Sequence, residues 1–191
     1  MDREKIKSLK KLIIIRHAKS DWSKHVSDLD RPISTRGIND AEIISDIFNS
    51  ENLKPEVIYT SIAKRTIETS EIFRDRCDFL KDLECLKSEK LYDFKGNNVK
   101  SFIRNLPNNL SSVLIFTHNN TCNFLVNDFS DKFNLHVPTC GMLIFEFSVS
   151  LWAEIEKSKN FSFFLPKRVQ VKKFEFKNRE LSWLEFNERV L

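Results

Sequence analysis

Residues Leu12–Ile15 are four consecutive apolar residues, and Arg16 and His17 follow them directly. An uninterrupted apolar run of this length, rich in β-branched residues, is typical of a central parallel strand with helices on both faces. In open α/β sheets, ligands bind beyond the carboxyl ends of the strands. We therefore expect an α/β fold in which Arg16 and His17 lie at the edge of the sheet where a ligand binds.

Two further segments repeat this arrangement of a short strand followed by polar residues. Ser112–Thr117 is a second apolar run and ends at His118, while the segment Pro55–Ser61 is followed by Arg65. Apolar residues recur at helical spacing after each of the three runs, which predicts alternating strands and helices. The predicted helices cover residues 35–48, 63–73 and 122–129, and β-forming residues at 142–147 and 161–165 predict two more strands.

The alternation predicts a three-layer α/β domain with a mostly parallel central sheet flanked by helices. Right-handed crossovers bring the carboxyl ends of parallel strands to one rim. We therefore expect Arg16, His17, Arg65 and His118 to meet there, whereas His25 and His136 have no such setting and are predicted to be surface or loop histidines.

Composition limits the kinds of protein this chain can be. Its 191 residues suffice for one sizeable core, which favours a single domain with an appendage. The net charge of +4 is spread along the chain, so no basic patch predicts nucleic-acid binding. No apolar run approaches the roughly 18 residues of a membrane span, and we expect a cytoplasmic protein with no membrane contact. The four cysteines lack metal-site spacing and are predicted to be reduced thiols.

The clustered side chains are suited to phosphoryl transfer. A neutral histidine with one ring nitrogen held by a hydrogen bond can attack phosphorus through the other, which predicts His17 as a nucleophile. Arg16 and Arg65 offer planar forks for phosphate oxygens, and His118 could donate to the same oxygens. Because the chain has only 3 glycines, it has no glycine-rich phosphate loop, and side chains must bind the anion.

Five motifs resemble the histidine phosphatase superfamily, and within it the SixA-like phosphohistidine phosphatases, over roughly residues 10–168. In chain order they are IRHAKSDW, DRPISTRG, TSIAKRTIETS, LIFTHNN and PTCGMLIFEF. The resemblance implies a phosphoglycerate mutase-like fold and an enzyme that needs no metal or other cofactor. It implies that His17 becomes phosphohistidine, that Arg16 and Arg65 bind phosphate, and that His118 is the second active-site histidine. It also implies that Arg31 contacts phosphate, and Asn119, which follows His118, is a further candidate for substrate binding.

The acidic proton donor of mutases and acid phosphatases in this superfamily has no obvious counterpart here. Glu89 and Asp93 are candidates by position only, and a solvated surface charge is the alternative for both. Without such an acid, a phosphoramidate is a more suitable substrate than an alkyl phosphate, because imidazole leaves more readily than an alkoxide. The short segment between Arg65 and His118 also predicts an open rim, which favours a phosphohistidine-bearing protein as the partner.

Residues 1–171 form the predicted phosphatase domain, and residues 172–191 the predicted tail. The tail segment 177–191 resembles the opening segment of bacterial polyphosphate kinase, without that enzyme's catalytic residues. A truncated fusion, a frameshifted join, a docking segment and an amphipathic terminal helix remain open as explanations of the tail. Two alternatives remain for the function: a small-molecule phosphatase of the same superfamily, or a noncatalytic phosphate-binding module. The sequence does not predict an oligomeric state.

Overall fold

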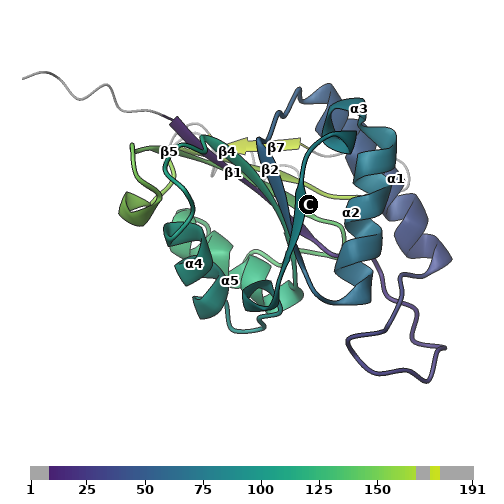
Figure 1. Cartoon of the computed structure of the whole chain (residues 1–191). Helices are drawn as coiled ribbons and strands as arrows, with labels where there is room; N and C mark the ends of the chain where they lie inside the picture. Colours follow the sequence, from purple (N-terminus) through teal and green to yellow (C-terminus); the bar gives the residue numbers. More distant parts are fainter. Residues whose placement is uncertain (1–8, 167–172, 177–191) are drawn as a thin grey trace, which may run out of the picture.

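The structure of the chain, a computed structural model, describes residues 9–166 and 173–176. Strands and helices alternate through its first two thirds, and strands dominate the last third (Figure 1). In chain order the elements are β1 (Leu9–Arg16), α1 (Thr35–Ser50), β2 (Val57–Ser61), α2 (Lys64–Arg76), α3 (Asp78–Lys81), β3 (Cys85–Ser88), the short 3₁₀ helix η1 (Glu89–Leu91), α4 (Asn97–Arg104), β4 (Ser112–Thr117), α5 (Asn119–Phe129), β5 (Met142–Ser148), the 3₁₀ helix η2 (Trp152–Glu154), β6 (Asn160–Phe164) and β7 (Lys173–Phe176). Every helix and strand predicted from the sequence is present, with ends shifted by a few residues.

The strands form one sheet in the order β3-β2-β4-β1-β5-β6-β7. The pairings among β3, β2, β4 and β1 are parallel, whereas β5 pairs antiparallel with β1, and β6 and β7 continue the antiparallel ladder. The predicted α/β class is thus confirmed, in a mixed sheet whose parallel half carries the strand ends of interest. Helices α1 and α2 cover one face of the sheet, and α4 and α5 cover the other (Figure 1).

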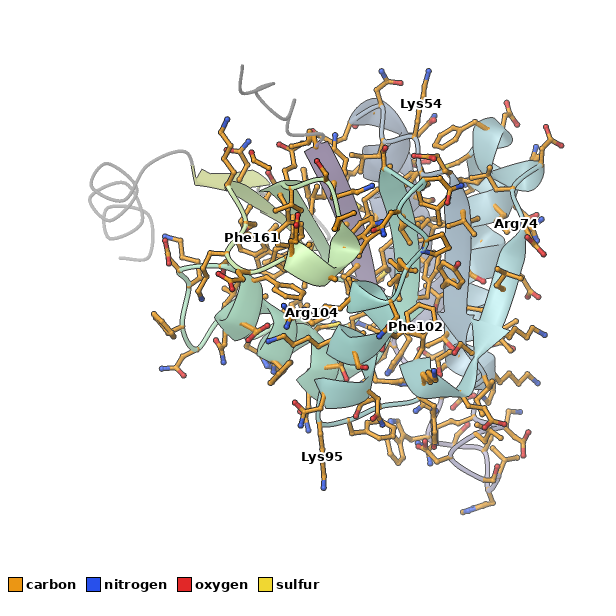
Figure 2. All side chains as sticks on the ribbon, turned by 60° about the vertical axis from the view of Figure 1, so that its left-hand side comes forward. Lys54, Arg74, Lys95, Phe102, Arg104 and Phe161 are labelled. Carbon is orange, nitrogen blue, oxygen red and sulfur yellow. The ribbon has the colours of Figure 1, made fainter. Side chains whose placement is uncertain are left out.

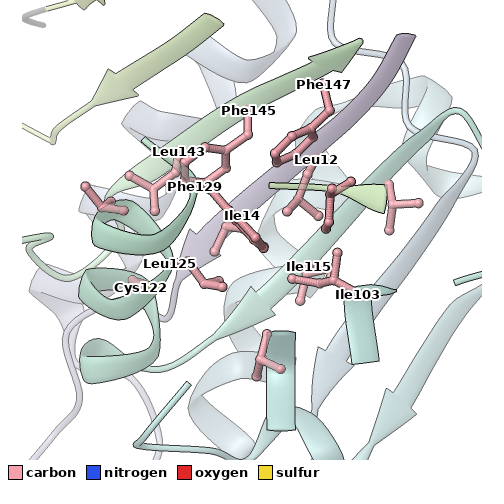
Figure 3. Close-up of a cluster of buried hydrophobic side chains, with 14 of the residues drawn as sticks. Leu12, Ile14, Ile103, Ile115, Cys122, Leu125, Phe129, Leu143, Phe145 and Phe147 are labelled. Atoms are coloured by element: carbon pink, nitrogen blue, oxygen red, sulfur yellow. The ribbon is translucent and has the colours of Figure 1, made fainter. Parts of the chain in front are cut away.

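The apolar run Leu12–Ile15 lies in the central strand of this sheet, and its side chains pack on both faces. Leu12 and Ile14 belong to the cluster packed beneath α4 and α5 (Figure 3), while Ile13 and Ile15 belong to the cluster packed against α1 and α2. All four side chains are fully buried. Because successive residues of a strand point to opposite faces, only a strand covered by helices on both sides requires four apolar residues in a row.

The loop between β1 and α1 is closed at its base. Ser20 and Ile33 form an isolated antiparallel bridge, and the Ser34 hydroxyl caps α1 by accepting from the Gly37 N–H. A Cβ atom at Gly37 would lie 2.4 Å from the Lys19 carbonyl oxygen, so this close approach requires glycine. The base of the loop is therefore fixed next to His17, while residues 21–32 project from it.

Two strands were not predicted, β3 and β7. β3 is a short edge strand that pairs only with β2, and its four residues include a lysine and a serine. β7 pairs with β6 and lies beyond residue 171, on the tail side of the predicted domain boundary. That boundary stays a prediction, and the segment 177–191, with its resemblance to polyphosphate kinase, lies outside the described residues.

Side chains fill the space between the layers (Figure 2). Phe102 of α4, labelled in that view, meets Tyr59 of β2 edge to face with ring centroids 5.0 Å apart. All four cysteines are free thiols, as predicted. No helix in the described part of the chain combines the length and apolar character needed to cross a membrane.

Candidate active site

The carboxyl ends of three neighbouring parallel strands bring the predicted residues together. His17 follows β1, His118 follows β4, and Arg65 is the second residue of α2, just after β2. The ring centroids of His17 and His118 lie 5.4 Å apart, and Nη2 of Arg65 lies 3.3 Å from Nδ1 of His118. The predicted convergence of these three side chains is confirmed.

A hydrogen bond to the backbone fixes the tautomer of His17. Its Nδ1 lies 2.7 Å from the Ala18 carbonyl oxygen, and a carbonyl can only accept, so Nδ1 carries the proton. Burial lowers the pKa of His17 to about 3; the Ala18 hydrogen bond opposes this shift, and the charges of Arg65 and Arg16 add to it. The imidazole is therefore neutral at pH 7, with an unprotonated Nε2.

The same reasoning fixes the proton of His118. Arg65 can only donate, so Nδ1 of His118 accepts its hydrogen bond, and Nε2–H donates to the Ser61 hydroxyl at 2.8 Å. Burial, together with the nearby His17 and Arg65, lowers the pKa of His118 to about 2. Ser61, the last residue of β2, was missed in the sequence, although the strand-end argument that selected Arg65 applies to it equally.

We expect both imidazoles to stay neutral well below the usual histidine range. In ¹⁵N NMR of the folded, ligand-free chain, His17 and His118 should keep the neutral pattern from pH 7.5 down to pH 4.5, because their pKa values lie near 3 and 2. The unfolded chain protonates them near pH 6.5, so the free energy of unfolding should fall as pH drops below 6.5. Protonation of either ring near pH 6.5 in the folded chain would contradict this.

One carboxylate joins Arg65 and Arg31. An Asp28 oxygen accepts from Nη2 of Arg65 at 2.9 Å and from the Tyr92 hydroxyl at 2.6 Å, and its other oxygen accepts from Arg31 at 2.7 Å. Partial burial raises the pKa of Asp28, but the bonds from Tyr92 and Arg65 and the charges of Arg65 and Arg31 outweigh it and bring the pKa to about 2. Asp28 and Tyr92 were not among the predicted site residues.

Arg16 lies close enough to both imidazoles for its charge to lower their pKa values. Its Nη1 donates to the Val137 carbonyl, which orients the guanidinium, while its buried Nε has no hydrogen-bond partner among the described residues. Asn119 is the first residue of α5. Its side-chain oxygen is buried and likewise has no hydrogen-bond partner in the described part of the chain. Arg16 thus lies at the site, and Asn119 follows His118 directly, with a buried side-chain oxygen that stays a candidate substrate contact.

The two candidate acids, Asp93 and Glu89, have different surroundings. The Asp93 carboxylate accepts the backbone N–H groups of Lys95 and Asn98, and of the next residue, so it caps the start of α4. Glu89 is exposed at the start of η1. The capping bonds explain why Asp93 is buried. The acid role of either residue stays a prediction. His25 and His136 are exposed, as predicted.

Aromatic side chains border the cluster. Tyr92 and Phe94 approach the His118 ring with centroid separations of 5.2 and 4.9 Å. On the loop side, the Arg31 guanidinium lies 3.7 Å from the centre of the Trp22 ring, which is 69% exposed. Within the described residues, no group of three or more His, Cys, Asp or Glu side chains is arranged to hold a metal ion.

Comparison with known proteins gives two independent similarities. Residues 12–95 match the histidine phosphatase superfamily (branch 1), a range that includes Arg16, His17 and Arg65. A 2,3-bisphosphoglycerate-dependent phosphoglycerate mutase from Cutibacterium acnes is 35% identical over 71 residues, which are 36% of this chain and 28% of the mutase. The match thus spans less than a third of that relative.

The fold is shared with solved structures at low sequence identity. The structure of a SixA protein from Agrobacterium tumefaciens matches with a TM-score of 0.63 at 19% identity. The match covers 80% of this chain and 96% of the SixA chain. The structure of a phosphoglycerate mutase from Bacillus anthracis matches with a TM-score of 0.57 at 13% identity. The match covers 82% of this chain and 94% of the mutase chain. The predicted phosphoglycerate mutase-like fold is confirmed. Residues 12–95 thus resemble the histidine phosphatase superfamily, and the chain shares its fold with SixA and phosphoglycerate mutase structures.

Proposed function

We propose that this chain is a phosphatase that removes the phosphoryl group from a histidine of another protein. The observation that carries the proposal is the hydrogen bond from Nδ1 of His17 to the Ala18 carbonyl, which leaves Nε2 unprotonated. Nε2 attacks phosphorus, the bond from phosphorus to the substrate imidazole breaks, and phosphate is carried on His17. Water then hydrolyses this phosphohistidine and releases orthophosphate.

Cations around His17 support this chemistry. Arg16 and Arg65 supply positive charge next to the imidazole, and Arg31 is linked to Arg65 through Asp28. Charge on a transferring phosphoryl group is spread over its equatorial oxygens, which planar guanidinium groups can bind in pairs. The reaction as proposed uses these side chains and no metal ion, and Asn119 remains a candidate substrate contact.

The leaving group decides between protein histidine and a small phosphate ester. The Asp93 carboxylate is held by backbone N–H groups at the start of α4, which disfavours it as the acid that would protonate a leaving alkoxide, and Glu89, exposed at the start of η1, stays a candidate. A phosphoramidate needs less help, because imidazole is the better leaving group. Hydrolysis of small phosphate monoesters is the second candidate, since a 2,3-bisphosphoglycerate-dependent phosphoglycerate mutase shares 35% identity over 71 residues of this chain. Comparing kcat/KM on a phosphohistidine-bearing protein and on a panel of monoesters tests the ranking, and clear preference for the monoesters would reverse it.

Exposed apolar side chains on the loop beside the site support a protein substrate. Val26 and Leu29, 45% and 37% exposed, flank Asp28 in the projecting loop. The double variant Val26→Ser/Leu29→Ser should raise KM for the phosphoprotein about fivefold, because apolar contacts at an interface are lost. Turnover of free phosphoimidazole should be unchanged. Phe133→Ser, at a residue 72% exposed just after α5, is the matched control. Equal effects on both substrates would argue against protein docking here.

A further inference from the structure

The Asp28 carboxylate occupies the donors that a bound phosphate would use. Nη1 of Arg65 donates to the Asp28 carbonyl and Nη2 to its carboxylate, so both ends of the guanidinium fork are engaged by one residue. Arg31 donates to the remaining carboxylate oxygen. A bound phosphate is expected to lie between two arginines, and here the Asp28 carboxylate has that position between Arg65 and Arg31.

Tyr92 completes this set of contacts. Its hydroxyl donates to the Asp28 oxygen that also accepts from Arg65, and burial and the nearby carboxylate raise the pKa of Tyr92, so it stays protonated as a donor. The charge of Asp28 also raises the pKa values of His17 and His118, against the effects of burial and the arginines. The carboxylate is therefore electrostatically coupled to the whole cluster, and a second anion in the site would be repelled by it.

Asp28 is able to leave this position without disrupting the fold. Its side chain is 44% exposed, and the loop that carries it is anchored elsewhere, by the Ser20–Ile33 bridge and by the Lys64 N–H, which donates to the Leu29 carbonyl. A change of side-chain rotamer would turn the carboxylate into water and free Nη2 of Arg65 and Nη1 of Arg31. The bond from Nη1 of Arg65 to the Asp28 carbonyl and the other backbone contacts of the loop would remain.

We propose that Asp28 is an internal competitor of the substrate phosphate: it neutralises Arg65 and Arg31 in the ligand-free chain, and an incoming phosphoryl group must displace it. The proposal rests on the phosphatase function proposed above. Asp28 therefore sets the affinity of the site, because only the fraction of molecules with the carboxylate withdrawn binds the anion. Weakly charged anions are excluded, and a phosphoryl group, which can contact both arginines at once, competes best.

Calorimetric titration of the full chain with orthophosphate at pH 7.5 tests this. Asp28→Asn should bind orthophosphate about tenfold more tightly than the unchanged chain, because the competing charge is removed. Asp28→Ala should also bind orthophosphate more tightly than the unchanged chain. This second variant excludes an effect that comes from the side-chain amide of Asn. Asp30→Asn is the matched control, since Asp30 lies two residues away and accepts from Ser27. Its orthophosphate affinity should change less than about twofold, since Asp30 is exposed and salt screens its charge.

Unchanged or weaker orthophosphate binding in both Asp28 variants would overturn the proposal, as would an equal gain in Asp30→Asn. Loss of turnover in Asp28→Asn without tighter binding would also overturn it, and would assign Asp28 to the chemical step instead. Failure of the phosphatase function has a different signature. Tighter anion binding in a chain that hydrolyses no phosphoramidate or monoester would leave Asp28 as a competitor and remove the proposed reaction.

Discussion

Replacement of His17 by Asn is expected to reduce turnover of a phosphohistidine-bearing protein by at least about 10³-fold, as loss of a covalent nucleophile does in other enzymes. The side-chain amide of Asn can still donate to the Ala18 carbonyl, so the local backbone should be retained, but no lone pair replaces Nε2. The measurement is single-turnover release of orthophosphate, with a thermal denaturation curve to confirm folding.

His25→Asn is the control for this experiment, because His25 is an exposed histidine in the loop that follows β1. Its turnover should match that of the unchanged chain. Comparable rates for His17→Asn and the unchanged chain would show that another group attacks phosphorus. A folded but inactive His17→Asn chain that still binds orthophosphate would separate the loss of the nucleophile from the loss of the site.

Arg65→Lys is expected to lower kcat/KM about a hundredfold while the charge is kept, because an ammonium cannot present two parallel donors to the transferring phosphoryl group. Arg65 is 3% exposed and its guanidinium contacts both Asp28 and His118, so the flexible lysine would lose these contacts as well. The effect should appear in kcat at saturating substrate, since transition-state charge is the part lost.

Arg76→Lys tests whether any arginine of α2 would give the same result. Arg76 is the last residue of α2, and its Nη2 lies 2.8 Å from a carboxylate oxygen of Asp46 at the surface. Activity should be unchanged in this variant. If Arg65→Lys lowered kcat/KM no more than Arg76→Lys, Arg65 would have a structural role and the phosphate would be bound by other side chains.

Much of the fold followed from residues whose pattern has a single physical interpretation. Leu12–Ile15 could be buried on both faces only in a central strand, and it lies at the centre of the sheet. Since parallel strands end at one rim, the convergence of His17 and His118 could also be predicted, although a hundred residues separate them in sequence. β3 gave too weak a pattern, with two apolar residues among four.

The contacts that the sequence could not reveal belong to loops and caps. Asp28 reaches Arg65 and Tyr92 across 37 and 64 residues, and its position depends on how the loop between β1 and α1 folds back. Asp93, a candidate acid by its position in the sequence, accepts N–H groups five and six residues ahead, in the first turn of α4. Neither spacing follows helical or strand periodicity.

The proposed reaction depends on phosphate being carried on His17. The most direct test is rapid mixing of the chain with a ³²P-labelled phosphohistidine protein, followed by quenching in alkali, where phosphohistidine survives, and by peptide mapping. We expect label on the peptide containing His17, bonded through Nε2, and no label in His17→Asn. Label on any other residue, or orthophosphate release by His17→Asn at the rate of the unchanged chain, would contradict it.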